Sequence, residues 1–350
     1  MFYKIKKSSP LGKLLIGFYK PPGKIPRLHN EANVVILFTF LKFEFYNMRY
    51  TLIFLITLLS FHCKVFSQKT EFKVMAWNIL RSGNQIENGV DIVSDIIKEI
   101  NPDVVLMVET YGSGPYIAKK NGYNFHLVAK EGTTPDDKSV NLSIYSKFPF
   151  GERIDTEYPF FLGGIEILIN NKKVRFFSNW FHYQPWNNKP EEMGKTVEEL
   201  LEWEKTEHRY NMIQKVLPYF KKYANESDSI PIIVGGDMNS PSHLDWSKKT
   251  KKIHNDLVVP WYSTKVFEDL GFTDSYRHEN PNPLKHPGIT WDHKERDDSQ
   301  RIDYIFFKGK KLKSTSSNTY MQFFNENINI NNKQFKYPSD HGIVVTNFKF

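Results

Sequence analysis

Side chains that can bind a cation or transfer a proton recur where apolar segments of this sequence end. They are Asn78, Glu109, His182, Asp237, Asn239, Asp303, Asp340 and His341. Carboxylate and amide oxygens are the ligands that hard divalent cations prefer, and carboxylates and histidines are common general acids and bases. Any one of them has an ordinary structural explanation, such as a turn cap or a packed imidazole. The ordered set instead indicates a reactive site.

Strands and helices alternate in the pattern around these residues, which predicts an α/β or α+β fold. Strands are predicted at residues 72–79, 103–109, 142–146, 174–181, 230–234, 301–307 and 343–350, and helices at 91–100 and, as the longest stretch, 191–223. The asparagine-rich stretch 325–332 is predicted to be a surface loop. Strand ends in a layered fold meet at one edge, where loops can gather reactive groups on a rigid scaffold.

The order of these segments resembles the endonuclease/exonuclease/phosphatase superfamily, which includes pancreatic-type deoxyribonuclease, apurinic-site endonucleases and neutral sphingomyelinases. The matching pieces are MAWNI (Asn78), PDVVLMVE (Glu109), LSIYSKFP (142–149), FHYQP (His182), GGDMNS (Asp237, Asn239), ITW (Trp291), RIDYIF (Asp303) and SDH (Asp340, His341). The resemblance runs from about residue 71 to the C-terminus. It implies an α+β, deoxyribonuclease-like fold, a four-layer α/β/β/α sandwich of two packed mixed β-sheets flanked by helices.

The resemblance also implies a metal-dependent phosphoester hydrolase, most simply a phosphodiesterase, with Mg²⁺ as the expected cofactor and Mn²⁺ or Ca²⁺ as alternatives. Glu109 would bind the metal, with Asn78 and Asp340 near it. A bound cation would neutralise the charge that develops on the phosphate. No cluster of Cys or His suggests structural zinc.

Proton transfer would fall to the remaining members of the set. Asp237 suits the deprotonation of the attacking water, and Asn239 would orient the water or the phosphate. His341, held by Asp303, would contact a phosphate oxygen as an imidazolium, although a His341–Asp303 base is an alternative. His182 would be a second phosphate donor or the acid for the leaving group.

Three aromatic residues beside these motifs, Tyr183, Trp186 and Trp291, are predicted to contact the substrate. For Trp246 and Trp261, packing of the loops themselves is an equally good interpretation. The substrate could be a nucleic acid, a lipid head group or a small phosphodiester, so a nuclease and a sphingomyelinase-like enzyme both remain open. No long apolar hairpin of the kind that enters membranes is evident, and no protein partner is inferred.

The net charge of +8 in 350 residues suggests a polyanion binder, but its distribution removes most of that suggestion. Residues 1–67 contain 10 Lys and Arg against 2 Asp and Glu, whereas residues 68–350 contain 37 of each. A neutral domain weakens the case for tight duplex binding, because Lys and Arg contacts to phosphates supply much of that affinity. It does not exclude a nuclease.

The N-terminal region predicts export. Residues 48–67 begin Met48-Arg49, continue with the apolar run YTLIFLITLLSF and end at Ser67, which is typical of a signal peptide. Residues 1–47 would be an upstream extension, and residues 68–350 the catalytic domain. The mature protein would be secreted or periplasmic, without a transmembrane anchor and, because Cys63 is the only cysteine, without disulfides.

A different class of protein also fits the fold, namely a binding module that has lost catalysis. Such a module should lack at least one of the residues that the reaction needs. All of them are present in this chain: Glu109, Asp237, Asn239, Asp303 and His341. The sequence therefore favours an enzyme. A secreted carbohydrate-binding protein would explain the tryptophans but not the acidic and histidine residues.

Overall fold

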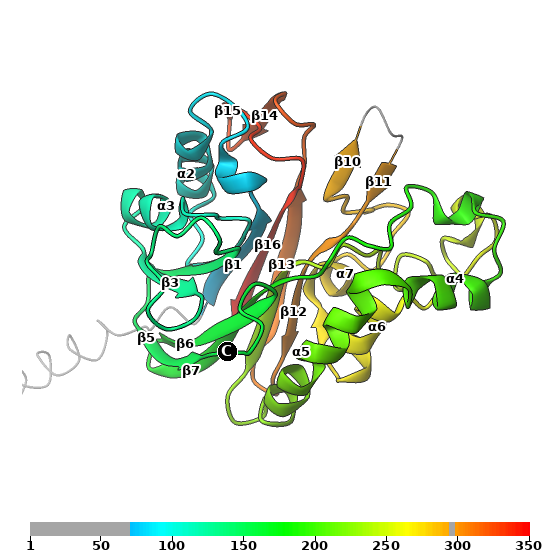
Figure 1. The fold of residues 1–350 in the computed structure, drawn as a ribbon, viewed down its shortest axis with the longest axis horizontal. Coiled ribbons are helices and arrows are strands. Elements are labelled where there is room, and N and C mark those ends of the chain that lie inside the picture. The colour runs from blue at the N-terminus through cyan, green and yellow to red at the C-terminus, as the bar shows by residue number, and fades with distance from the viewer. Residues whose placement is uncertain (1–70, 294–297) are drawn as a thin grey trace, which may run out of the picture. The chain divides into compact units, whose positions relative to one another are not determined.

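Two six-stranded sheets form the centre of the computed structural model, which describes residues 71–293 and 298–350 (Figure 1). The first sheet has the order β13 (Lys313–Tyr320), β16 (Ile343–Lys349), β1 (Glu71–Asn78), β2 (Val104–Val108), β4 (Leu142–Ser146), β3 (Asn124–Val128). The second has the order β5 (Phe150–Ile154), β6 (Leu162–Ile169), β7 (Lys172–Trp180), β8 (Ile232–Asp237), β12 (Asp303–Lys308), β9 (Thr273–Asp274). Both sheets are mixed, because β1 pairs in parallel with β2 and β7 with β8.

The central strands are apolar on both faces because each sheet is covered on both sides. In β1, Phe72, Val74 and Ala76 enter the core between the two sheets. Met75 and Trp77, which alternate with them, enter a second core. The period of two along the strand therefore supplies side chains to both layers.

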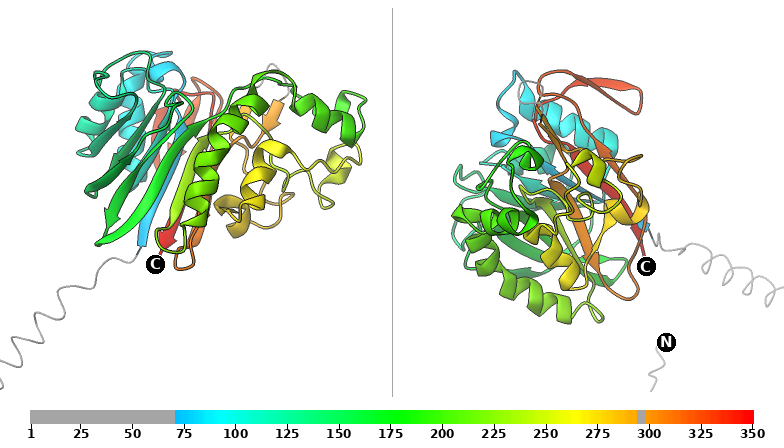
Figure 2. Two further views of the ribbon diagram at one scale, coloured as in Figure 1. Left: turned by 60° about the horizontal axis from the view of Figure 1, so that its bottom comes forward. Right: turned by 90° about the vertical axis from the view of Figure 1, so that its right-hand side faces the viewer.

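Helices cover the two outer faces and complete four layers (Figure 2). α2 (Gly89–Ile100) and α3 (Gly114–Lys120) pack on the first sheet, where Ile96, Ile97 and Ile117 are buried. α5 (Glu207–Asn225) and α6 (Tyr262–Asp269) pack on the second sheet through residues such as Ile213 and Phe267. The predicted four-layer α/β/β/α sandwich is confirmed.

A small lobe extends the edge of the second sheet. It contains α4 (Val197–Glu204) and two loops, each with a short 3-10 segment: η2 (Pro190–Glu192) before α4 and η3 (Lys251–Ile253) after β8. Trp246 and Trp261 are 5% and 0% exposed and pack there with Leu200 and Val259. These two indoles therefore pack the lobe itself.

Two of the predicted elements differ in the structure. Residues 191–223 form three segments in place of one helix, since Thr196 caps α4 with a capping box and Thr206 stands ahead of α5, where Glu207 has a positive φ of 57°. Residues 325–332 were predicted as a loop but contain β14 (Asn327–Ile330), paired with β15 (Lys333–Lys336). Ile328 and Ile330 of this hairpin are buried against the α2 side of the first sheet, and this tertiary contact overrides the weak strand propensity of asparagine.

The remaining elements complete the described chain. They are the 3-10 segment η1 (Arg81–Gly83), α7 (Ser275–Glu279), and the hairpin of β10 (Trp291–His293) and β11 (Asp298–Gln300). The predicted extension (1–47) and signal peptide (48–67) lie outside the described residues. Within residues 71–293 and 298–350, no helix has both the length and the hydropathy that crossing a membrane would require.

Gly236 is the glycine on which the geometry of the central strand β8 depends most. Its φ is +147°, and an added Cβ would lie 1.9 Å from the carbonyl oxygen of Asn179 on β7. We expect Gly236→Ala to lower the free energy of unfolding by about 3 kcal/mol, measured by chemical denaturation. Gly122→Ala is the matched control, because Gly122 also has a positive φ (+71°) but no atom within 4 Å of the added Cβ. A loss of only about 1 kcal/mol is expected there, and equal losses in both variants would contradict this account.

Candidate active site

All of the predicted reactive residues lie at one edge of the two sheets. Asn78, Glu109 and Asp237 stand at or just beyond the C-terminal ends of β1, β2 and β8. β12 runs antiparallel to β8, so Asp303 at its start pairs with Asp237 at the end of β8. His341 precedes β16, which runs antiparallel to β1. Strand direction thus brings residues more than 200 positions apart to the same edge.

Asp237 is held by two amide side chains. Its Oδ1 accepts a hydrogen bond from the backbone N–H of Asn239 (2.8 Å). Its Oδ2 accepts bonds from Asn239 Nδ2 (2.8 Å) and from Asn78 Nδ2 (3.2 Å). Asp237 is 1% exposed, so these bonds fix the carboxylate in a site from which water is largely excluded.

Asn239 adopts a left-handed backbone conformation, with φ of 48°, that asparagine tolerates better than most residues. Its Nδ2 also donates to the backbone oxygen of Phe181 (2.9 Å), the residue before His182. The buried guanidinium of Arg209 on α5 donates to the carbonyl oxygens of Asn239 and, at 3.2 Å, of Tyr183. Arg209 therefore joins α5 to both loops that carry the site.

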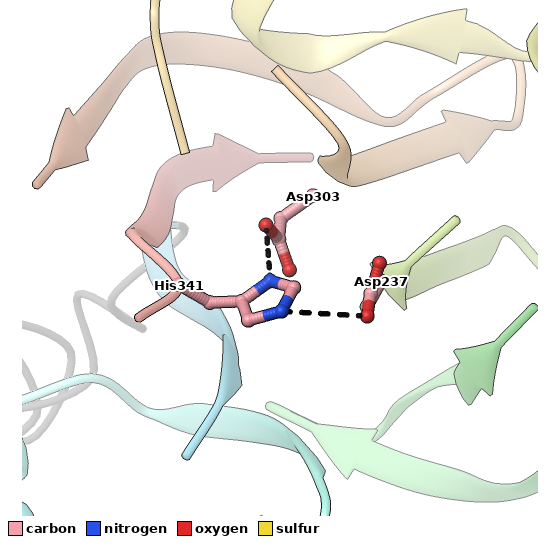
Figure 3. Close-up of side chains that lie close together, drawn as sticks. All are labelled: Asp237, Asp303 and His341. Carbon is pink, nitrogen blue, oxygen red and sulfur yellow. Dashed lines mark hydrogen bonds and ion pairs between the residues drawn. The ribbon is translucent and has the colours of Figure 1, made fainter. Parts of the chain in front are cut away.

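His341 lies between two carboxylates (Figure 3). Its Nδ1 is 3.1 Å from Asp303 Oδ2, and its Nε2 is 3.8 Å from Asp237 Oδ2. The ligand atoms of these three residues all lie within 4.8 Å of one another. The predicted His341–Asp303 pair is therefore present. The other ring nitrogen of His341, Nε2, faces Asp237, the predicted base.

Burial and charge together shift the pKa values of this group. Burial would lower the pKa of His341, but the carboxylates of Asp303 and Asp237 outweigh it and raise that pKa well above its ordinary value. Burial raises the pKa of Asp237 to about 8, against the opposing effect of His341. These shifts favour the protonated form of His341 and make Asp237 a stronger base than an exposed aspartate.

Two of the predicted metal residues, Asn78 and Glu109, are joined to each other and, through Asn78, to Asp237. Asn78 Nδ2 donates to Glu109 Oε1 (3.1 Å), and the backbone N–H of Arg81 donates to Glu109 Oε2 (2.8 Å). Asp340 Oδ1 lies 4.0 Å from His341 Nε2 and is a buried oxygen that accepts no hydrogen bond among the described residues. A buried carboxylate oxygen without a hydrogen-bond donor fits a hard divalent cation.

His182 follows β7, whose last residue, Trp180, pairs with Asp237. Its Nδ1 accepts a hydrogen bond from the backbone N–H of Gln184 (3.0 Å), so the proton of the neutral ring is on Nε2. Burial, together with the neighbouring side chains of His208 and Arg209, lowers the pKa of His182. His182 is therefore a neutral N–H donor, in contrast to the charged His341.

The three predicted substrate contacts occupy different environments. Trp291 packs edge to face against His341, with 4.8 Å between ring centroids. Trp186 packs against Trp291 (6.0 Å), so it touches the reactive group only through that ring. Tyr183 is 51% exposed and stacks on His182 (4.5 Å). Trp291 and Tyr183 thus lie at the site, and Trp186 lies one ring further out.

Several residues that orient the site were not predicted. Asn141 Oδ1 accepts the backbone N–H of Glu109 (3.0 Å), and Ser339 Oγ donates to the Asn78 carbonyl (2.7 Å) and accepts the His341 N–H (3.0 Å). Thr290 Oγ1 accepts the N–H of Asp303 (3.0 Å). Of the unpredicted residues that orient the site, Arg209 alone had a sequence signal. It precedes the apolar Met212 and Ile213 by three and four residues, which places a cation on the buried face of the helix.

Comparisons with known proteins extend this description. Over 321 residues the chain is 29% identical to "Uncharacterized protein F14F9.5" of Caenorhabditis elegans, which covers 85% of this chain and 98% of that protein. Its fold is similar to that of D. rerio TDP2 complexed with a single-strand DNA product (TM-score 0.52, 14% identity, 81% of this chain and 100% of the other). It is also similar to truncated C. elegans TDP2 (TM-score 0.50, 15% identity, 80% and 98%).

The family itself is established by a match over most of the chain. The model of the "Endonuclease/Exonuclease/phosphatase family" matches residues 75–341, a range that begins in β1 and ends at His341. The match therefore includes strands of both sheets and every residue of the predicted site. This chain belongs to the endonuclease/exonuclease/phosphatase family and is a hydrolase of phosphoester bonds.

Proposed function

We propose that this protein is a divalent-metal-dependent phosphodiesterase that acts through the residues described above. The observation that carries the proposal is the placement of His341 between Asp237 and Asp303, beside the Glu109–Asn78 pair. That arrangement offers a base, a fixed cation and a set of oxygen ligands within one small volume. These are the parts that hydrolysis of a phosphodiester requires.

Asp237 is the proposed general base. Burial raises its pKa to about 8, which brings its basicity close to neutral pH. Its two oxygens are held by Asn239 and Asn78, so its orientation does not depend on the substrate. The ionised form would take the proton of a water molecule aligned with the phosphorus. Asn239 keeps the carboxylate aimed at that position.

The two histidines are the proposed donors to the phosphate. His341 carries a positive charge that Asp303 orients, and it would stabilise the negative charge that develops on a phosphate oxygen. His182 presents a neutral Nε2–H, set by the bond from Gln184, to a second oxygen or to the leaving group. The two histidines therefore offer one charged and one neutral N–H donor to two positions on the phosphodiester.

A divalent cation would be held by Glu109 and Asp340, with Asn78 at their side. The donor set of carboxylate and amide oxygens suits Mg²⁺, and equally Mn²⁺ or Ca²⁺. When bound, such a cation neutralises charge on the phosphate. Arg81 and Asn78 would position the Glu109 ligand, because they hold both of its carboxylate oxygens.

A nucleic acid is the substrate class that we favour among phosphodiesters. D. rerio TDP2, which shares the fold, has been solved with a single-strand DNA product. The balanced charge of residues 68–350 favours recognition by local contacts over tight binding of a duplex. Plasmid DNA, single-stranded DNA, RNA, sphingomyelin and a phosphomonoester should be compared as substrates. Turnover of sphingomyelin or the monoester alone would reject this choice.

We further propose that the protein is exported, with the signal at residues 48–67 and the mature enzyme secreted or periplasmic. The support is the positive start and apolar run of that segment. N-terminal sequencing of the mature protein is the test. A mature terminus upstream of Met48 would reject the assignment.

Glu109→Gln should raise the Mg²⁺ concentration that gives half-maximal activity by about tenfold or more, because a charged ligand becomes neutral. The measurement is a metal titration of bis-p-nitrophenyl phosphate hydrolysis. Glu152→Gln, at an exposed position on β5, is the control and should leave the titration unchanged. An unchanged titration in Glu109→Gln would remove this residue from the metal site.

A further inference from the structure

A groove beside His182 has not yet been given a role. It encloses about 310 Å³ and is lined by Phe161, His182, His208, Asn211, Met212 and Lys215. This volume lies at the lower end of the range for small-ligand sites, about 300–1,000 Å³. Because His182 forms part of its wall, a group in the groove would be attached directly to the reacting phosphate.

One wall of the groove is aromatic. Phe161 stacks on Trp180 (6.2 Å between centroids, 22° between planes), and Trp180 packs against His182 (5.7 Å). His182 in turn stacks on Tyr183 at 4.5 Å. Phe160, which is 38% exposed, meets the edge of Trp180 at 5.6 Å. The rings thus form a continuous row, of which Phe161 and His182 line the groove.

The other wall is polar and belongs to α5. His208, Asn211 and Lys215 are spaced by three and four residues, so they lie on one face of the helix. All three are exposed, while Met212 between them is 5% exposed and closes the floor. His208 packs on the ring of His182 at 4.7 Å. This wall therefore offers hydrogen-bonding groups opposite the rings of Phe161 and His182.

The charge of the groove narrows the class of ligand that it can bind. Lys215 is the charged side chain of the lining set, which contains no carboxylate. Its Nζ lies 5.7 Å from the centroid of the Tyr158 ring. A cationic group such as choline would meet Lys215 unfavourably, whereas a phosphate would be attracted to it. A lipid tail would leave the polar wall unsatisfied.

We propose that this groove binds the nucleoside esterified to the scissile phosphate, with its base stacked on the aromatic wall and an adjacent phosphate near Lys215. Stacking on aromatic rings and contact with local cations is how proteins hold single strands without reading their sequence. Asn211 can both donate to and accept from the edge of a base. The inference rests on the proposed phosphodiesterase function and names its substrate class as single-stranded nucleotides.

The test compares two chromogenic diesters, thymidine 5′-(p-nitrophenyl phosphate) and methyl p-nitrophenyl phosphate, with the full-length protein and Mg²⁺. The wild type should prefer the nucleoside ester in kcat/KM by about tenfold or more, because one base stack is worth about 1–3 kcal/mol. Phe161→Leu should reduce this preference by about fivefold or more. Lys215→Gln should reduce kcat/KM for a dinucleotide bearing a second phosphate more than for the thymidine ester.

Lys221→Gln is the matched control, since Lys221 is exposed on the same helix outside the groove. It should leave both ratios unchanged. Lys215→Gln alters an exposed side chain, so it provides a test even if Phe161→Leu fails to fold. Equal turnover of the two esters by the wild type, or a preference for p-nitrophenyl phosphorylcholine, would overturn the nucleoside assignment. Absence of turnover with every diester would instead overturn the proposed function.

Discussion

Replacement of Asp237 by asparagine is expected to lower kcat/KM for a phosphodiester by about 10³-fold or more. The substitution preserves volume but removes the proposed base, whose contribution to such reactions is about 10²–10⁴-fold. Both Asp237 oxygens accept hydrogen bonds from Asn239. In the variant, the new amide NH₂ would therefore face a hydrogen-bond donor of Asn239 in place of an acceptor. Steady-state hydrolysis of bis-p-nitrophenyl phosphate at saturating Mg²⁺ measures the effect.

Asp228→Asn is the matched control for this variant. Asp228 lies ahead of β8, whereas Asp237 ends that strand. The Asp228 carboxylate pairs with Lys310 at the surface. Near-wild-type activity is expected there. Far-ultraviolet circular dichroism should show that both variants keep the fold. Near-normal turnover in folded Asp237→Asn would show that another group activates the water.

Replacement of His341 by glutamine should cause a loss of similar size, about 10³-fold. Glutamine can still donate a hydrogen bond, but it cannot carry the charge that Asp303 orients. The variant also leaves Asp237 and Asp303 buried without the cation between them. Both the rate and the pH dependence of stability should therefore change.

The direction of the change in the pH dependence of stability follows from the pKa of Asp237. Burial already raises the pKa of Asp237 to about 8 in the presence of His341. A buried carboxyl whose folded pKa lies above its unfolded value favours the fold at low pH and loses that contribution as pH rises through the folded pKa. Below about pH 6, His341 is protonated in both the folded and the unfolded wild type, so its own titration does not affect the comparison. In EDTA, the melting temperature of His341→Gln should fall more than that of the wild type between about pH 4 and pH 6, because the opposing effect of His341 on the pKa values of Asp237 and Asp303 is lost.

His286→Gln is the control for this second variant, because the His286 side chain is exposed and has no part in the site described above. Its activity and melting profile should follow those of the wild type. Parallel pH profiles for His341→Gln and the wild type would contradict the proposed charge arrangement. Retained activity in His341→Gln would exclude the imidazolium as a phosphate donor.

Much of the fold followed from the apolar segments, because strands buried on both faces have an unmistakable composition. Residues 142–146 were predicted with the bounds that β4 has, and the polar residues at the strand ends do meet at one edge. The opposite directions of β8 and β12, which place Asp303 beside Asp237, could not be read from either segment alone. Pairing is a property of the whole sheet.

What the sequence did not indicate depends on tertiary contact. The break before α5 turns His208 and Lys215 toward His182, and periodicity over residues 191–223 does not show where a helix must break. Asn141 and Ser339 act through hydrogen bonds to Glu109 and His341, and their residue types carry no signal of that role. Ring contacts such as Trp291 with His341 likewise arise from a bridge between distant segments.

The most direct test of the central claim is the hydrolysis of bis-p-nitrophenyl phosphate by the purified wild-type protein, followed before and after removal of divalent cations with EDTA. The proposed site predicts that EDTA abolishes turnover and that Mg²⁺ restores it, because the Glu109 group needs a cation to neutralise the phosphate. Asp237→Asn should stay inactive at every Mg²⁺ concentration. Turnover that is insensitive to EDTA, or none under any metal condition, would contradict the claim that this site is a metal-dependent phosphodiesterase.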